Sequence, residues 1–205
     1  MNSRHHNVVA RDVHLQAVLE ETYDRSFFLA TEREYYRERA GRPNGIAARP
    51  SDWALDVRTA LSHAHLLRPL ATRMAQILDS DGVTQIAGYG YGSFLLVGGI
   101  LSAAPAGMRG GMIREARKRY GFRRIIEGDL SPDAPVVIID DVVSSGRHAM
   151  QAAAELRAEG LHPLGVLTVF AYSWRSADRT LIANGFSLRA LADVHARGSL
   201  TSTCS

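Results

Sequence analysis

Short apolar runs alternate with segments of helical periodicity over most of this chain. The run Val136-Val137-Ile138-Ile139 contains no polar residue, which is typical of a strand buried on both faces inside a parallel sheet. Alternating strands and helices of this length predict an α/β fold, an open and mostly parallel twisted sheet with helices on both faces. The further strands that we expect are 83–87, 107–113, 164–171 and 188–191, and the helices are 66–78, 94–103, 149–159 and 177–184.

The N-terminal part has a different pattern. Residues 12–40 combine an apolar stripe with dense charge, which predicts two helices, and the turn-forming residues 42–45 end them. We therefore expect a small N-terminal helical cap, or hood, at 1–45, a main domain at 46–198 and a flexible Ser/Thr-rich tail at 199–205.

Composition places the chain among soluble globular proteins. Its 205 residues are 46% hydrophobic, enough for a packed core, and no apolar run is long enough to span a membrane. The N-terminus carries no apolar segment resembling a signal peptide, and the one cysteine, Cys204, cannot form an internal disulfide. We therefore expect a cytoplasmic protein with no membrane partner. The net charge is +3, with basic residues scattered except between Arg114 and Arg124, which favours a local anion site over a nucleic-acid surface.

Two adjacent carboxylates, Asp140 and Asp141, directly follow the apolar run. Ligands of open α/β sheets bind outside the carboxyl ends of the strands, so we expect this pair to face a crevice. The hydroxyls of Ser144 and Ser145 and the backbone N–H groups of 146–148 then precede a helix, whose first turn offers unpaired donors to a phosphate. The simpler interpretation is a strand whose acids bind a metal, as in Walker-B or response-regulator sites. The lack of a Gly-x-x-x-x-Gly-Lys motif and of an acidic cluster near the N-terminus disfavours it.

This segment resembles the 5-phosphoribosyl-1-pyrophosphate (PRPP) motif of the type I phosphoribosyltransferases, in which an apolar strand runs into two acids and a Thr/Ser-x-Gly loop. The resemblance implies the type I phosphoribosyltransferase fold, with 46–198 as the phosphoribosyltransferase domain. It also implies that the two acids hold the ribose 2′- and 3′-hydroxyls and that the loop holds the 5′-phosphate. Two carboxylates accept both hydroxyl hydrogens of a vicinal diol, and their charge favours an oxocarbenium-like sugar. The PRPP-binding residues implied are Asp140, Asp141, Val142, Val143, Ser144, Ser145, Gly146, Arg147 and His148.

A glycine-rich segment, Gly88-Tyr89-Gly90-Tyr91-Gly92-Ser93, connects an expected strand to an expected helix. It lacks the sixth-position glycine and the later acid of a dinucleotide-binding fingerprint. The type I family has its pyrophosphate loop at this place, and backbone N–H groups approach a diphosphate only where side chains are absent. The resemblance implies pyrophosphate binding by Tyr89, Gly90, Tyr91 and Gly92, and an ordinary strand-to-helix turn is the alternative.

The basic segment 114–121 carries Lys118, the only lysine among the 24 Lys and Arg residues. Followed by an Ile-Glu-Gly, it resembles the flexible catalytic loop of orotate phosphoribosyltransferases, to which Arg114, Lys118 and Gly121 correspond. An ammonium and a guanidinium are not interchangeable in compact phosphate chemistry, so a single lysine at this place is notable.

Two positions of this loop depart from the family pattern. Glu115 stands where the family has a second lysine, and Tyr120 where it has a histidine, so the loop carries less positive charge and a different proton donor. The resemblance implies catalytic roles for Lys118, Arg114 and Asp141, with both basic groups on the pyrophosphate. A solvated charge run is the alternative.

The segment 51–58, which leads from an aromatic strand to an Asp-x-Arg and a helix, resembles the early segment of orotate phosphoribosyltransferases. Many members bind the orotate carboxylate with a lysine before this segment and an arginine after the penultimate long strand. Ile46 and Tyr172 occupy those positions here, although Arg49 stands close to the first. Because a buried carboxylate without its cation is costly, the acceptor is either orotate-like or an altered, less charged base. The base-binding residues implied are Ile46, Arg49, Trp53, Ser144 and Tyr172, with core packing as an equal alternative for Trp53.

The resemblance as a whole implies an enzyme, a pentosyltransferase that moves the 5-phosphoribosyl group of PRPP to a ring nitrogen of a heterocyclic base with release of pyrophosphate. Mg²⁺ is the implied cofactor. Diphosphate and ribose oxygens supply most of its coordination, so no protein ligand is assigned, and Asp140 and Asp141 are the carboxylates available to it. The resemblance also implies a homodimer with shared active sites, in which Lys118 reaches the neighbouring subunit. The alternative is a regulator on the same fold that senses PRPP or a nucleotide without catalysis.

Overall fold

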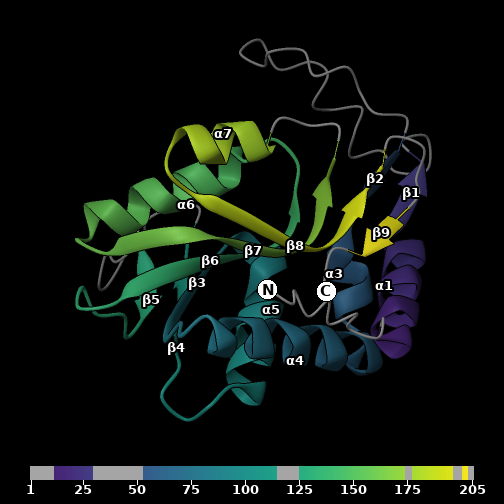
Figure 1. Cartoon of the computed structure of the whole chain (residues 1–205), viewed down its shortest axis with the longest axis horizontal. Coiled ribbons are helices and arrows are strands. Elements are labelled where there is room, and N and C mark those ends of the chain that lie inside the picture. Colours follow the sequence, from purple (N-terminus) through teal and green to yellow (C-terminus); the bar gives the residue numbers. More distant parts are fainter. Residues whose placement is uncertain (1–11, 30–52, 115–124, 174–176, 196–199, 203–205) are drawn as a thin grey trace, which may run out of the picture.

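The computed structural model describes residues 12–29, 53–114, 125–173, 177–195 and 200–202. Their main strands are β3 (Gln85–Tyr89), β4 (Arg109–Ile113), β5 (Ile126–Gly128), β6 (Pro135–Val143), β7 (His162–Tyr172), β8 (Ser187–Val194) and β9 (Leu200–Ser202). These strands form one seven-stranded sheet in the order β5-β4-β3-β6-β7-β8-β9 (Figure 1). Strands β4, β3, β6, β7 and β8 run parallel, and the short outer strands β5 and β9 pair antiparallel with their neighbours.

Helices cover both faces of this sheet (Figure 1). One face carries α1 (Val13–Ser26), α3 (Val57–Leu61), α4 (Ala64–Ser80) and α5 (Gly90–Ala103), and the other carries α6 (Arg147–Ala158) and α7 (Ala177–Ala183). Beside α1, a two-stranded antiparallel sheet joins β1 (Phe27–Leu29) to β2 (Trp53–Leu55). Within the described ranges no helix has the length and apolar character needed to cross a membrane.

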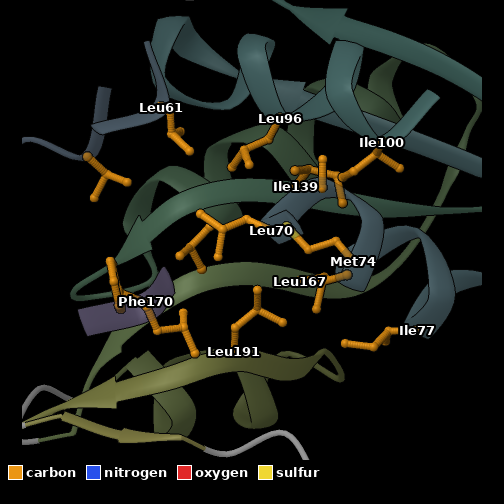
Figure 2. Packing of buried hydrophobic residues seen from close by; sticks show 14 of the residues in the cluster. Leu61, Leu70, Met74, Ile77, Leu96, Ile100, Ile139, Leu167, Phe170 and Leu191 are labelled. Atoms are coloured by element: carbon orange, nitrogen blue, oxygen red, sulfur yellow. The ribbon is translucent and has the colours of Figure 1, made fainter. Parts of the chain in front are cut away.

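The central strand β6 is held by hydrophobic packing on both sides. Val137 and Ile139 belong to the core on the α4 and α5 side, and Val136 and Ile138 belong to the core on the α6 side. This alternation follows from the two-residue period of a strand, and it explains why the sequence here is apolar without interruption. Figure 2 shows part of the larger core, where side chains of α4 and α5 meet those of the sheet, among them Leu70, Met74, Leu96, Ile100, Leu167, Phe170 and Leu191.

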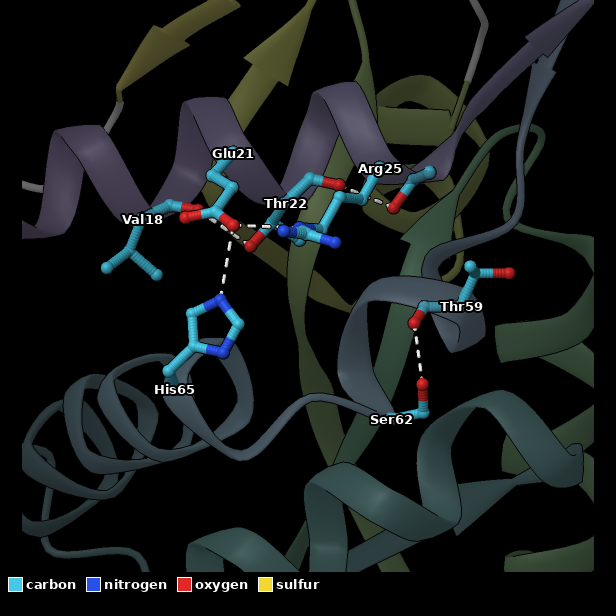
Figure 3. A network of polar contacts seen from close by, with 8 residues as sticks. Val18, Glu21, Thr22, Arg25, Thr59, Ser62 and His65 are labelled. Atoms are coloured by element: carbon cyan, nitrogen blue, oxygen red, sulfur yellow. Dashed lines mark hydrogen bonds and ion pairs between the residues drawn. The ribbon is translucent and has the colours of Figure 1, made fainter.

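Helix α1 packs into the same larger core. Leu19 and Tyr23 are buried there. On its outer side, Glu21 accepts a hydrogen bond from Arg25 Nε at 2.7 Å and lies 3.1 Å from Nε2 of His65 on α4 (Figure 3). Helix α1 is therefore fastened to α4 by both apolar and polar contacts.

The topology confirms the predicted fold class, while residues 27–29 and 200–202 differ from the sequence predictions. Residues 27–29 are extended in β1, where we expected helix to continue, because they pair with β2 and with no residue close in sequence. Residues 200–202 form β9 against the edge strand β8, where we expected a flexible tail. The predicted boundary between a cap and a main domain, at residue 45, lies outside the described residues and stays a prediction.

Candidate active site

The acid pair lies at the carboxyl end of the central strand. Asp140 and Asp141 are half-buried, and the parallel neighbours β3 and β7 end at the same edge of the sheet. The Asp141 N–H donates to Oδ1 of Asp140 at 2.9 Å, and the Val142 N–H donates to Oδ1 of Asp141 at 2.9 Å. The side chains of Val142 and Val143 pack against opposite cores, so these two residues have only backbone to offer a ligand.

Burial and mutual repulsion govern the charge of this pair. Burial raises the pKa of Asp140 well above its usual range, and the neighbouring charge of Asp141 raises it further. Burial also raises the pKa of Asp141, while its hydrogen bonds to Asp140 and to the backbone, and the charge of Arg58, act in the opposite direction. Such a pair accepts hydrogen bonds readily. Two hydroxyls of a sugar diol are suitable donors.

The glycine-rich segment brings backbone against the acid pair. Gly90 has a φ of +74°, which allows β3 to turn directly into α5. A Cβ built on Gly92 would collide with the carboxylate of Asp141, and one built on Gly88 would lie 2.9 Å from Cγ2 of Val97. Helix α5 begins at Gly90, so the loop that we expected over 88–93 is the end of a strand and a first helical turn. Tyr91 is exposed on that turn.

A second strand-to-helix turn follows the acid pair. Gly146 also has a φ of +74° and is the N-cap residue of α6, so the N–H groups of the first turn of α6 begin directly after it. Behind it lies α7, with Cγ of Leu181 3.3 Å from a Cβ built on Gly146. Ser145, Arg147 and His148 are exposed beside this turn, and Ser144 is half-buried. The ring centroids of Tyr89 and His148 are 5.9 Å apart, so the two turns lie next to each other.

Arg114 lies at the carboxyl end of β4, two strands away from the acid pair. Its guanidinium Nη1 is 3.5 Å from Oε1 of Glu127, and its backbone N–H donates to the carbonyl of Ile125 at 2.9 Å. Lys118 comes between Arg114 and Ile125 in the sequence. Like Glu115 and Tyr120, it lies outside the described residues.

Two of the predicted base-binding residues meet in space. Trp53 of β2 and Tyr172 of β7 lie edge to face with 5.7 Å between ring centroids, although more than a hundred residues of sequence separate them. Trp53 also stacks on Phe27 at 5.4 Å, and both Trp53 and Tyr172 pack against the larger core. The core-packing alternative for Trp53 therefore has direct support. Ile46 and Arg49 lie outside the described residues.

Sequence reasoning missed one residue near this site, Arg58. The Asp-x-Arg pattern at 56–58 was noticed only as part of a family resemblance, and nothing in it indicates where the guanidinium lies. Burial raises the pKa of Asp141, and the charge of Arg58, more than eighty residues away in sequence, lowers that pKa to a smaller extent.

The comparisons with known proteins point to one family, although no protein-family model matches the chain. The chain is similar to the orotate phosphoribosyltransferase of Porphyromonas gingivalis, with 27% identity over 158 residues that cover 74% of each protein. It is 30% identical to that of Halalkalibacterium halodurans over 140 residues, 67% of this chain and 66% of the relative.

Solved structures agree with the sequence relatives. The orotate phosphoribosyltransferase of Mycobacterium tuberculosis H37Rv in complex with Fe(III) dicitrate has a TM-score of 0.69 and 20% identity, covering 86% of this chain and 94% of that one. The same enzyme in complex with PRPP has a TM-score of 0.66 and 17% identity, covering 88% and 89%. The structural matches confirm the predicted fold, and the sequence matches confirm the predicted resemblance.

Proposed function

We propose that this orotate phosphoribosyltransferase-like enzyme moves the 5-phosphoribosyl group of PRPP to a ring nitrogen of a heterocyclic base, with inversion at the sugar carbon and release of pyrophosphate. One observation carries the proposal. Two carboxylates stand at the end of the central strand, between two strand-to-helix turns that each begin with a glycine at a φ of +74°. Such an arrangement offers acceptors to a diol and backbone donors to two separate phosphate groups.

Each part of PRPP has a matching group in the site. Asp140 and Asp141 accept the hydrogens of the ribose hydroxyls, and their negative charge stabilises the cationic sugar that develops as the bond to pyrophosphate breaks. The turn at 144–148 holds the 5′-phosphate through hydroxyls and N–H groups, with Arg147 adding a charge-assisted contact. The turn at 89–92 presents backbone to the diphosphate, because Gly92 leaves no side chain between them.

Mg²⁺ is compatible with these donors. It prefers oxygen ligands and usually keeps several from water or from substrate phosphates. In the described part of the chain no group of three or more His, Cys, Asp or Glu side chains is arranged to hold a metal. Asp140 and Asp141 offer carboxylate oxygens, and PRPP brings the rest. Bound there, Mg²⁺ would neutralise charge on the diphosphate and so favour its departure.

The acceptor is the open part of the proposal. The names of the sequence relatives favour orotate, and the replacement of two cations by Ile46 and Tyr172 favours a less charged ring. In the structure, Tyr172 stands at the end of β7 with Trp53 against it, while Trp53 already stacks on Phe27. We therefore propose Tyr172, with Ser144 and Arg49, for contact with the base and assign Trp53 to supporting Tyr172.

We further propose that the enzyme works as a homodimer with shared sites. Lys118, with Arg114, would neutralise charge on the leaving pyrophosphate, so Lys118→Ala should lower kcat by about two to three orders of magnitude. If Lys118 acts in the neighbouring site, a mixture of Lys118→Ala subunits with Asp140→Asn/Asp141→Asn subunits should regain part of the activity. A mixture no more active than either parent would show that each subunit uses its own lysine.

The decisive experiment is pyrophosphate release from PRPP and Mg²⁺ with a panel of bases, including orotate and uracil, alongside calorimetric titration with PRPP. The proposal expects binding of PRPP and turnover with at least one base. Turnover with orotate at a kcat/KM in the usual enzyme range, about 10⁴ M⁻¹s⁻¹ or higher, would assign the chain to orotidylate formation. Binding without turnover on any base would favour the second candidate, a PRPP-sensing regulator. The departures from the family's catalytic-loop pattern at Glu115 and Tyr120 support that candidate.

A further inference from the structure

We infer that Glu127 is a positioning residue of the active site, which holds the guanidinium of Arg114 beside the turn at 89–92, ready for the diphosphate of PRPP. This inference rests on the proposed function and deepens it, because it assigns a role to a carboxylate that the reaction leaves unexplained. Glu127 lies on β5, and Arg114 follows the last residue of β4. These two strands pair antiparallel at the edge of the sheet.

The strand register places Arg114 next to that turn. Ile113, directly before it, pairs with Tyr89 at the end of β3, and α5 begins at the following residue. Side chains alternate between the two faces of a strand, so Arg114 shares a face with Gly110. A Cβ built on Gly110 would lie 2.6 Å from Cδ1 of Leu101 on α5. Arg114 therefore lies on the side of the sheet that α5 covers, near the first turn of that helix.

Glu127 lies on the same side of the sheet. It is directly opposite Met112, two residues before Arg114, and directly opposed residues of paired strands project to the same face. Oε1 of Glu127 is 3.5 Å from Nη1 of Arg114. A guanidinium has five N–H donors in a rigid fork, so one oxygen at this distance leaves the group able to bind an anion as well. The Nε of Arg114 is buried and has no hydrogen-bond partner in the described part of the chain, so the guanidinium can still gain an acceptor.

The Glu127 carboxylate has two opposing effects on a bound diphosphate. Its contact restricts the long side chain of Arg114 before the ligand arrives, which removes part of the entropy cost of binding. Leaving one such side chain unrestrained weakens binding by about 2- to 10-fold. The negative charge of Glu127 repels the diphosphate, but the side chains of Glu127 and Arg114 are 36% and 39% exposed, so water and the guanidinium both screen this charge. We therefore expect the orienting effect to outweigh the repulsion.

The plainer interpretation is an ordinary ion pair at a sheet edge, with no link to ligand binding. The chain offers a matched control, because Arg189 Nη1 and Asp81 Oδ2 form an ion pair at 2.9 Å with side chains 54% and 50% exposed. Arg189 lies on β8, on the other side of the acid pair from β4. Exposed pairs contribute little to stability, so Glu127→Ala and Asp81→Ala should each change Tm by less than about 2 °C.

Calorimetry with two ligands tests the link to the diphosphate. Glu127→Ala should raise the Kd for PRPP with Mg²⁺ about fivefold. It should leave the Kd for ribose 5-phosphate unchanged, because that ligand meets the acids and the turn at 144–148 but carries no diphosphate. Glu127→Gln, which keeps an acceptor oxygen and the same size, should recover most of the affinity for PRPP, and Asp81→Ala should match wild type with both ligands. Equal weakening toward both ligands by Glu127→Ala would indicate a general structural effect and would overturn the inference.

A double-mutant cycle shows whether Glu127 acts through Arg114. Arg114→Ala should raise the Kd for PRPP about 10- to 100-fold, and adding Glu127→Ala to it should change the Kd by no more than about twofold. A further loss as large as in the wild-type background, or tighter binding of PRPP by Glu127→Ala alone, would overturn the inference. Wild-type protein that fails to bind PRPP would overturn the proposed function together with this inference. A wild type that binds and a Glu127→Ala variant that binds equally well would overturn this inference alone.

Discussion

The two strand-to-helix turns on either side of the acid pair begin alike and then differ. Gly90 and Gly146 share a φ of +74°, and each stands at the start of a helix on a neighbouring strand of the sheet. After Gly90 comes α5, an apolar helix. Its second glycine, Gly92, lies directly against the carboxylate of Asp141. After Gly146 comes α6, which begins with the exposed side chains of Arg147 and His148.

If both turns bind phosphate as proposed, they would do so in two ways from one backbone geometry. The turn after β3 would offer main chain at Gly92, where a side chain is excluded because it would displace the acid. The turn after β6 has the exposed side chains of Ser145, Arg147 and His148, so substitutions there would change its specificity. We expect the first turn to tolerate almost no change and the second to tolerate changes except at Gly146.

The acid pair lies next to both turns. Replacing its two carboxylates should therefore have the largest effect on PRPP binding. Asp140→Asn/Asp141→Asn should weaken PRPP binding by about a thousandfold or more, since two charged acceptors of the ribose hydroxyls are lost. Calorimetry measures the binding, and circular dichroism checks that the fold is kept. If the double variant bound PRPP like wild type, the acids would have no part in the site.

A methyl group at Gly92 tests the first turn. Gly92→Ala should weaken PRPP binding by about 10- to 100-fold, because the new Cβ forces Asp141 to move, at a cost of about 1–3 kcal/mol. Gly98→Ala is the matched control in the same helix, since a Cβ built there has no atom within 4 Å. It should leave binding unchanged and raise stability slightly through better helix propensity. Equal behaviour of the two variants would remove the distinction between the turns.

A methyl group at Gly146 tests the second turn through backbone geometry. Gly146→Ala should cost about 1–2 kcal/mol of stability, because a left-handed conformation is unfavourable for alanine, and should weaken PRPP binding by about tenfold. Gly160→Ala, at the far end of α6 with a φ of +77°, imposes a similar backbone cost with nothing within 4 Å. Thermal unfolding should show a comparable loss in both, and calorimetry should show weaker binding only for Gly146→Ala.

The pH dependence of stability tests the acid pair without involving either turn. We expect it to be the smallest of the four effects. The pKa of Asp140 is raised in the folded state above its ordinary value of 3.8, so the folded protein holds that proton more tightly than the unfolded chain does. This tighter binding of the proton stabilises the folded state. The stabilisation is fully present below pH 3.8 and is lost as the pH rises through the raised pKa of Asp140. Asp140→Asn should therefore raise Tm at pH 7 by about 2–4 °C and leave it unchanged near pH 3.5. A Tm gain of the Asp140→Asn variant that is independent of pH would contradict this assignment.

The central part of the fold was predictable because local pattern and tertiary role agree there. In residues 136–146, the apolar run, the two acids and the glycine turn indicate a buried strand and its functional end. This prediction does not require knowing which strands lie beside it. The three-residue strand β1 was not predictable, because it exists only through pairing with β2, and the same holds for β9 on β8. The contact between Gly92 and Asp141, and the influence of Arg58 on Asp141, depend on how α5 and α3 pack, which no spacing in the sequence encodes.

The two antiparallel outer strands also bear on how the protein behaves at high concentration. β5 pairs with residues 111–113 of β4, and β9 pairs with residues 192–194 of β8, so each covers the carboxyl half of its neighbour. The amino halves of β4 and β8 meet no further strand among the described residues, and each of them carries an exposed arginine, Arg109 or Arg189. Short outer strands and charged side chains both discourage the sheet of one molecule from extending onto that of another. At each edge of this sheet, a short antiparallel strand at one end and an exposed arginine at the other therefore discourage edge-to-edge aggregation.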